Sequence, residues 1–189
     1  MALGNNSGAS KKFVTIVGGK WVVKVDEGTE GAVTRENKLG EIVHELQYSY
    51  VDGDIAGGRI KQGQFGSTVE LELVDDGEAY NVQIPVPAIG QIGDYFMTFG
   101  KACRNIDPTK KLFLGLGFDK DRNHSFLYLK QEGQTVKSAF TKEDPNGLPP
   151  WEKKTAMGKT VWNADLQNEF LYGEIQDFFA SLGSTEVPF

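Results

Sequence analysis

Two segments near the middle of the chain alternate apolar with polar residues. They span 67–74 and 79–86, and Val69, Leu71 and Leu73 mark the apolar face of the first. A period of two is typical of strands that bury one face. An Asp-Asp-Gly turn separates the two segments. We therefore predict a β-hairpin here.

The period changes after this hairpin. Apolar residues at 89, 92, 96, 99, 103 and 106 recur in steps of three and four, which predicts one stripe of a helix that ends before Pro108. Alternation returns at 112–118, 125–131 and 135–141 and predicts three more strands. A second helical stripe predicts a C-terminal helix over 165–182, with Gly183 in the position typical of a C-terminal cap.

The first third of the chain adds further strands. We predict strands at 12–17 and 21–25 joined by a Gly-Gly turn, and another at 42–51. The segment 54–61 reads as a strand interrupted by glycines, which indicates a bulge or a bend.

From residue 54 onward the predicted order is β-β-β-α-β-β, which is the order of an OB-fold. We therefore predict a mainly β (α+β) fold: an OB-fold five-stranded Greek-key barrel with N-terminal extra strands, one inter-strand helix and a C-terminal helix. Another α+β sandwich built on the same meander is the alternative. The predicted units are a disordered N-terminus (1–11), the barrel domain with its strand extension (12–160), the C-terminal helix (161–183) and a C-terminal tip (184–189).

Composition narrows the class of protein. Of the 189 residues, 39% are hydrophobic and 11% aromatic, which is enough for a substantial core. No apolar run reaches the roughly 18 residues of a membrane span, and the first residues lack the pattern of a signal peptide. The single cysteine, Cys103, lies on the helical stripe, so we expect a buried, reduced thiol and a cytosolic protein.

The net charge of −6 is unevenly spread. Acids dominate 26–78, whereas bases outnumber acids in 101–160. An acidic total argues against a simple basic nucleic-acid binder, but local patches set the field at a groove. The sequence shows no nucleophile elbow, phosphate loop, dinucleotide fingerprint or His/Cys cluster of metal-ligand spacing. We therefore expect no enzymatic activity, no cofactor and no metal site.

Aromatic and basic residues interleave at candidate surface positions, a combination suited to single-stranded nucleic acid because rings stack on bases and cations neutralise phosphates. The candidate rings are Trp21, Tyr48, Phe65, Tyr80, Tyr128 and Trp151. The candidate phosphate contacts are Arg35, Lys38, Arg59, Lys61, Lys130, Lys137, Lys153 and Lys154. Phe113, which shares a strand face with Gly115 and Gly117, is a further candidate platform.

The chain ends in Glu186, Val187, Pro188 and Phe189. A terminal ring can fill an apolar pocket on a partner while the α-carboxylate and a nearby acid meet basic residues, as in C-terminal carboxylate capture. This tip resembles the ending of bacterial single-stranded DNA-binding proteins, although its acidic run is diluted. We predict that it binds a partner protein.

The resemblance extends along the chain. Blocks at 32–38, 66–71, 80–85, 139–149 and 159–163 resemble those of tailed-bacteriophage single-stranded DNA-binding proteins. The resemblance implies an OB-fold that coats single-stranded DNA during phage replication or recombination, in the host cytoplasm, and recruits replication or recombination proteins through its C-terminus. Homo-oligomerisation and cooperative assembly on DNA stay open. The alternatives are a protein–protein adaptor or virion component on the same barrel, and an enzyme.

Overall fold

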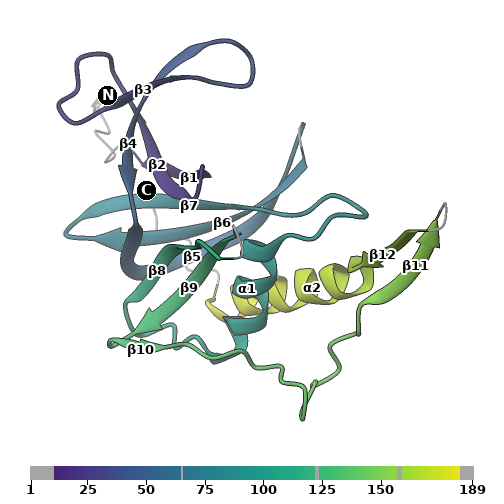
Figure 1. Cartoon of the computed structure of the whole chain (residues 1–189). Coiled ribbons are helices and arrows are strands. Elements are labelled where there is room, and N and C mark those ends of the chain that lie inside the picture. Colours follow the sequence, from purple (N-terminus) through teal and green to yellow (C-terminus); the bar gives the residue numbers. More distant parts are fainter. Residues whose placement is uncertain (1–10, 65, 122–123, 157–158, 184–189) are drawn as a thin grey trace, which may run out of the picture.

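The computed structural model describes residues 11–64, 66–121, 124–156 and 159–183. Strands and two α-helices make up the fold (Figure 1). In chain order the elements are β1 (Lys12–Val17), β2 (Lys20–Val25), β3 (Val33–Glu36), β4 (Ile42–Tyr48), β5 (Tyr50–Gly63), β6 (Gly66–Asp75), β7 (Glu78–Pro85), α1 (Asp94–Ala102), the 3₁₀ turn η1 (Cys103–Asn105), β8 (Leu112–Asp119), β9 (His124–Gln131), β10 (Gln134–Thr135), β11 (Glu152–Ala156), β12 (Lys159–Asn163) and α2 (Asp165–Ser181).

Ten of these strands form one mixed sheet in the order β10-β9-β8-β5-β6-β7-β1-β2-β4-β3. Neighbouring strands are antiparallel except β1 and β7, which run parallel. The sheet is open, because β10 and β3 at its two ends do not pair with each other. The mainly β, α+β class is thus confirmed, with strands before the first helix and a second helix near the end. The closed OB-fold barrel is not confirmed.

The long strand β5 joins two parts of this sheet. Residues 50–53 pair with β8, and residues 54–63 pair with β6. A β-bulge between Ile55 and Gly57 shifts the register by one residue. Tyr50 and Asp52 before the bulge, and Arg59 and Lys61 after it, consequently all lie on the face opposite the core. The glycine-interrupted strand predicted at 54–61 is confirmed, and it begins four residues earlier.

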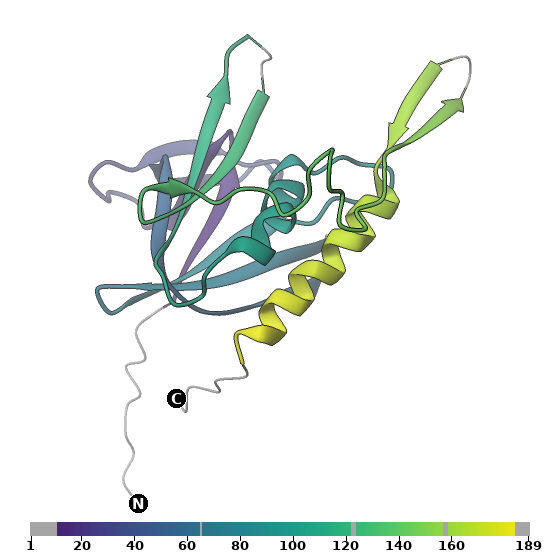
Figure 2. The same ribbon diagram turned by 90° about the horizontal axis from the view of Figure 1, so that it is seen from below.

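The core lies between the leucine face of the sheet and the two helices. Val69, Leu71 and Leu73 of β6 are fully buried, as are Phe96 and Phe99 of α1 and Leu171 and Ile175 of α2. Burying each such side chain stabilises the fold by about 1.5–3 kcal/mol before the entropy of ordering is counted. Figure 2 shows α2 running alongside α1 across the sheet. The C-terminal helix is therefore part of the core.

Close approach of α2 to the sheet explains one glycine of β5. A Cβ atom on Gly58 would lie 2.2 Å from the ring of Phe179 on α2. The helix thus packs against bare backbone at this point, and any larger residue would push it away.

Several predicted elements have different bounds in the structure. The first helix begins at Asp94, not at residue 89, because residues 88–91 form a turn in which Gly90 has a φ of +80°. Ile89 is 95% exposed and does not belong to the helical stripe. The strand predicted at 42–51 divides at Ser49, and the one at 135–141 shrinks to the two residues of β10.

The hairpin β11–β12 was not predicted, and it projects beyond the start of α2 (Figures 1 and 2). The predicted boundary between 160 and 161 falls inside β12. Cys103 is buried as expected, and its burial raises the pKa of its thiol to about 12. The disorder predicted for residues 1–11 concerns a segment outside the described residues, apart from Lys11.

Candidate nucleic-acid interface

Four aromatic rings form a continuous row across β5, β8 and β9 on the face away from the core. Tyr50 stacks on Phe113 with ring centroids 4.8 Å apart and planes 20° apart. Phe113 lies 5.9 Å from Tyr128, which lies 6.2 Å from Phe126. Tyr50 and Phe126 are exposed, whereas Phe113 and Tyr128 are half-buried by their neighbours. We call these four residues the aromatic ladder.

Two glycines of β8 make room for the ladder. Gly115 pairs with Tyr128 and Gly117 with Phe126 across the β8–β9 hairpin. Cβ atoms at these glycines would lie 2.2 Å from the Tyr128 ring and 2.4 Å from the Phe126 ring. The rings therefore lie flat over the backbone of β8. Phe113 was predicted from its own strand, because it shares a face with Gly115 and Gly117. The pairing of these glycines with the rings of β9 emerges only in the structure.

A lysine lies next to two rings of the ladder. Lys130 pairs with Phe113, and its Nζ lies 6.0 Å from the Phe113 ring centroid and 5.5 Å from that of Tyr128. These are cation–π distances. Tyr128 and Lys130, a candidate ring and a candidate phosphate contact, thus lie together. The neighbouring rings of Tyr50 and Phe126 were not among the candidates.

A groove of about 600 Å³ opens at the Tyr50 end of the ladder. Its apolar walls come from β1, β2 and β4, and Tyr48 and Tyr80 lie on its lining together with Tyr50. Both tyrosines were candidates, and the structure brings them together here. The Tyr80 hydroxyl donates a hydrogen bond to Glu78 (2.6 Å), which raises the pKa of Tyr80 to about 12.

Three predicted phosphate contacts are engaged in ion pairs with buried carboxylates. Arg59 donates to Glu70 at 2.8 Å, and Lys61 lies 3.7 Å from the same carboxylate, which is 1% exposed. Burial is the largest single influence and would raise the pKa of Glu70. The hydrogen bonds of Arg59 and Asn81 and the charges of Arg59 and Lys61 together outweigh it, so the pKa lies below its ordinary value. Arg35 makes a two-pronged contact with Glu45 at 2.7 and 2.6 Å. These cations neutralise acids of the protein itself, which reduces the charge they offer to phosphate.

One candidate ring needs correction. Trp21 is fully buried, and its Nε1 donates a hydrogen bond to the Leu114 carbonyl (3.0 Å). The ring links β2 to β8 in the core and is not available to stack on a base. Its position between two lysines in the sequence suggested exposure, but the lysines alternate to the other face of the strand.

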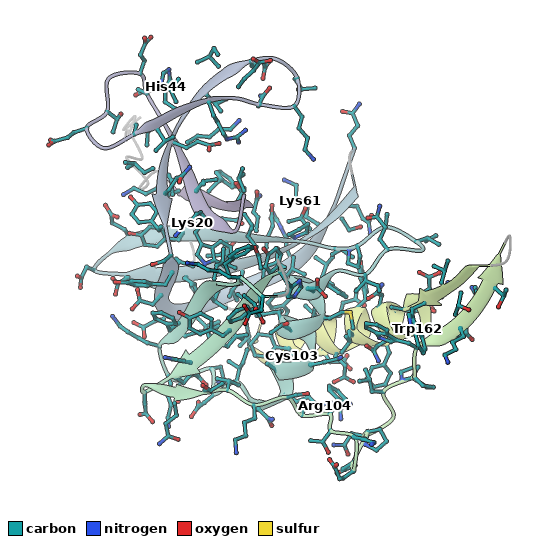
Figure 3. All side chains as sticks on the ribbon, in the orientation of Figure 1. Lys20, His44, Lys61, Cys103, Arg104 and Trp162 are labelled. Atoms are coloured by element: carbon teal, nitrogen blue, oxygen red, sulfur yellow. The ribbon has the colours of Figure 1, made fainter. Side chains whose placement is uncertain are left out.

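The remaining candidates lie apart from the ladder. Lys38 and Lys137 are exposed, in the β3–β4 turn and after β10. The projecting β11–β12 hairpin contains Lys153 and Lys154 in β11, and Trp151 directly precedes that strand. Figure 3 shows Trp162 of this hairpin far from Lys61 on the sheet. Phe65 and the tip at Glu186, Val187, Pro188 and Phe189 lie outside the described residues.

The hairpin carries a second, smaller aromatic pair. The Trp151 and Trp162 rings meet edge to face at 6.4 Å, and the Lys153 Nζ lies 4.9 Å from the Trp162 ring centroid. The Trp151 Nε1 donates to Gln167 of α2 at 2.8 Å, which anchors the base of the hairpin. Trp162 was not among the predicted site residues, and only its place in a basic, exposed hairpin singles it out.

Within the described ranges, no three His, Cys, Asp or Glu side chains gather into a group that could hold a metal ion. The same ranges contain no helix that is long and apolar enough to span a membrane. Comparison with protein-family models, curated proteins and solved structures found no significant match.

Proposed function

We propose that this chain is a non-enzymatic, phage-type single-stranded DNA-binding protein that coats and protects the strand in DNA replication or recombination. The observation that carries the proposal is the aromatic ladder: four rings in contact along one sheet face, two of them exposed. Stacking on such rings contributes roughly 1–3 kcal/mol per base and tolerates any base, because every base has a π-face.

Charge near the ladder agrees with this function. Lys130 lies over two of the rings, and the segment that supplies β8 and β9 carries more bases than acids. A strand stacked along the ladder would therefore have a cation within reach of its phosphates. Such a contact releases counterions from the phosphates, so binding should weaken as the salt concentration rises.

The relation of this sheet to an OB-fold barrel is part of the same proposal. The order β5-β6-β7-α1-β8-β9 is the one expected of an OB-fold, and β5 pairs with both β6 and β8. We infer an open relative of that barrel, in which β1 and β2 extend the sheet beyond β7.

The ladder can be tested against a matched ring on the same hairpin. Phe126 lies on the ladder face, whereas Phe118 of β8 is exposed on the opposite face. We expect Phe126→Leu and Tyr128→Leu each to weaken binding of a labelled mixed-sequence single strand about tenfold, and Phe118→Leu to leave it unchanged. Fluorescence anisotropy at low and high salt measures both effects.

Two results would contradict the proposal. Absence of binding at low salt would favour a protein–protein adaptor or virion component. Equal losses of DNA affinity in Phe118→Leu and Phe126→Leu would show that the ladder is not the contact surface.

The C-terminal tip has a separate role in this proposal. The ring of Phe189 and the carboxylate of Glu186 suit a basic, apolar pocket on a replication or recombination protein. Deleting residues 186–189 should leave DNA affinity unchanged or raised while abolishing capture of the partner. A large loss of DNA affinity on this deletion would contradict the assignment.

A further inference from the structure

The groove continues the path of the aromatic ladder. Tyr50 belongs to both: it stacks on Phe113 in the ladder and lines the groove. A single strand whose bases stack along the ladder therefore reaches the groove with its next base. The groove's volume of about 600 Å³ lies in the range of small-molecule sites, which is about 300–1,000 Å³.

The groove is lined by three carboxylates, and two of them already have cationic partners. Glu78 accepts hydrogen bonds from Lys12 and from the Tyr80 hydroxyl. Asp75 accepts one from Lys111 at 2.5 Å. Asp52 is the third, and it has no hydrogen bond or ion pair with any other residue in the described ranges.

Asp52 also has a fixed position relative to the ladder. It pairs with Phe113 across β5 and β8, and it lies two residues after Tyr50 on the same strand face. Its carboxylate is half-buried beside the rings. A base stacked on the groove side of Tyr50 would thus present its edge to this carboxylate.

We propose that Asp52 makes the groove selective for a base that carries an exocyclic amino group, such as cytosine, over one that lacks it. This inference rests on the proposed function. An ionised carboxylate is only an acceptor, so it binds an amino group and repels a ring carbonyl. Carboxylates accept from the amino group of cytosine in established readout of DNA bases. The same negative charge keeps phosphates out, so the base and not the backbone enters.

The test compares two oligomers that differ by that amino group alone. One is oligo-deoxycytidine, and the other is the same length of 2′-deoxyzebularine, in which hydrogen replaces the amino group of cytosine. We expect the native chain to bind the cytosine oligomer about tenfold more tightly, the size of one charge-assisted hydrogen bond. The isosteric variant Asp52→Asn keeps an acceptor oxygen but loses the charge, and it should reduce this ratio to about twofold, the lower end of the range for a neutral hydrogen bond.

A matched variant controls for net charge. Asp177 is exposed on α2, on the helix side of the sheet. Asp177→Asn removes the same charge and should keep the tenfold ratio. Circular dichroism and the thermal midpoint establish that both variants are folded.

The outcomes separate this inference from the proposed function. Equal binding of both oligomers by the native chain would overturn the selectivity and leave DNA binding standing. If Asp52→Asn raised the affinity for both oligomers by the same factor, the selectivity would also be overturned, because Asp52 would then act only by repelling DNA. Binding of neither oligomer at low salt would overturn the proposed function and the selectivity with it.

Discussion

Replacing Trp21 by Phe separates a structural from a DNA-binding role for this ring. The indole is fully buried, and its Nε1 bonds the Leu114 carbonyl at 3.0 Å, which links the N-terminal hairpin to β8. Phe would keep most of the apolar contact but would remove this hydrogen bond and leave a void.

The expected cost follows from these two losses. A buried hydrogen bond to a backbone carbonyl contributes about 1 kcal/mol net. The void of about 40 Å³ between the two side chains costs about 1 kcal/mol more at roughly 24 cal/mol per Å³. We therefore expect Trp21→Phe to lower the free energy of unfolding by about 2 kcal/mol, a large part of the total of a typical domain.

Urea denaturation followed by circular dichroism measures this change without depending on tryptophan fluorescence. Trp162→Phe is the control, because Trp162 is 46% exposed and its replacement should change the free energy of unfolding by less than about 0.5 kcal/mol. The folded Trp21→Phe variant should bind DNA with native affinity. Reduced DNA affinity at an unchanged urea midpoint would refute the structural role and restore Trp21 as a stacking platform.

Three further substitutions test other features. Gly115→Ala places a Cβ 2.2 Å from the Tyr128 ring, so we expect stability to fall by about 1–3 kcal/mol and DNA affinity to fall with the displaced ladder, as seen in urea denaturation and anisotropy. Gly173→Ala in α2 meets no atom within 4 Å and should raise the free energy of unfolding by about 0.5–1 kcal/mol in the same urea assay; a loss would show hidden crowding. The pKa of Glu70 lies below its ordinary value of 4.5, so its pairing with Arg59 adds stability that is present above pH 4.5 and is lost as the pH falls through the folded-state pKa. Glu70→Gln should therefore flatten the acid limb of the thermal midpoint plotted against pH, and an unchanged limb would contradict the role of this pair.

The alternating segments predicted the sheet well because one buried face imposes a period of two. The strands at 12–17, 67–74 and 112–118 all lie within one or two residues of β1, β6 and β8. The first helix was predicted too early because Ile89 and Ile92 continue the apolar spacing by coincidence, while a turn at Gly90 breaks the backbone. Apolar spacing alone therefore cannot reveal a turn when the residues on either side of it happen to keep the helical spacing.

The candidate site was harder to predict for a different reason. Whether an aromatic side chain enters the core depends on which strands become neighbours, and that pairing is not local. Trp21 is buried because its ring reaches β8, whereas Tyr50 is exposed because it lies opposite Gly115 of β8, which has no side chain to cover it. Likewise, Arg59 meets Glu70 only through the β5–β6 register.

The bulge in β5 carries a constraint on chain length. Side chains alternate along a strand, so the one extra residue between Ile55 and Gly57 puts the odd-numbered Arg59 on the face that the even-numbered Tyr50 occupies. If all residues were kept but the bulge were lost, regular alternation would turn one of these side chains into the core. Deleting Ala56 would instead remove the extra residue and the bulge together, and Tyr50 and Arg59 would stay on one face. The number of residues between the aromatic and the basic half of β5 is therefore coupled to the bulge, and one can change only together with the other if the two halves are to share a face.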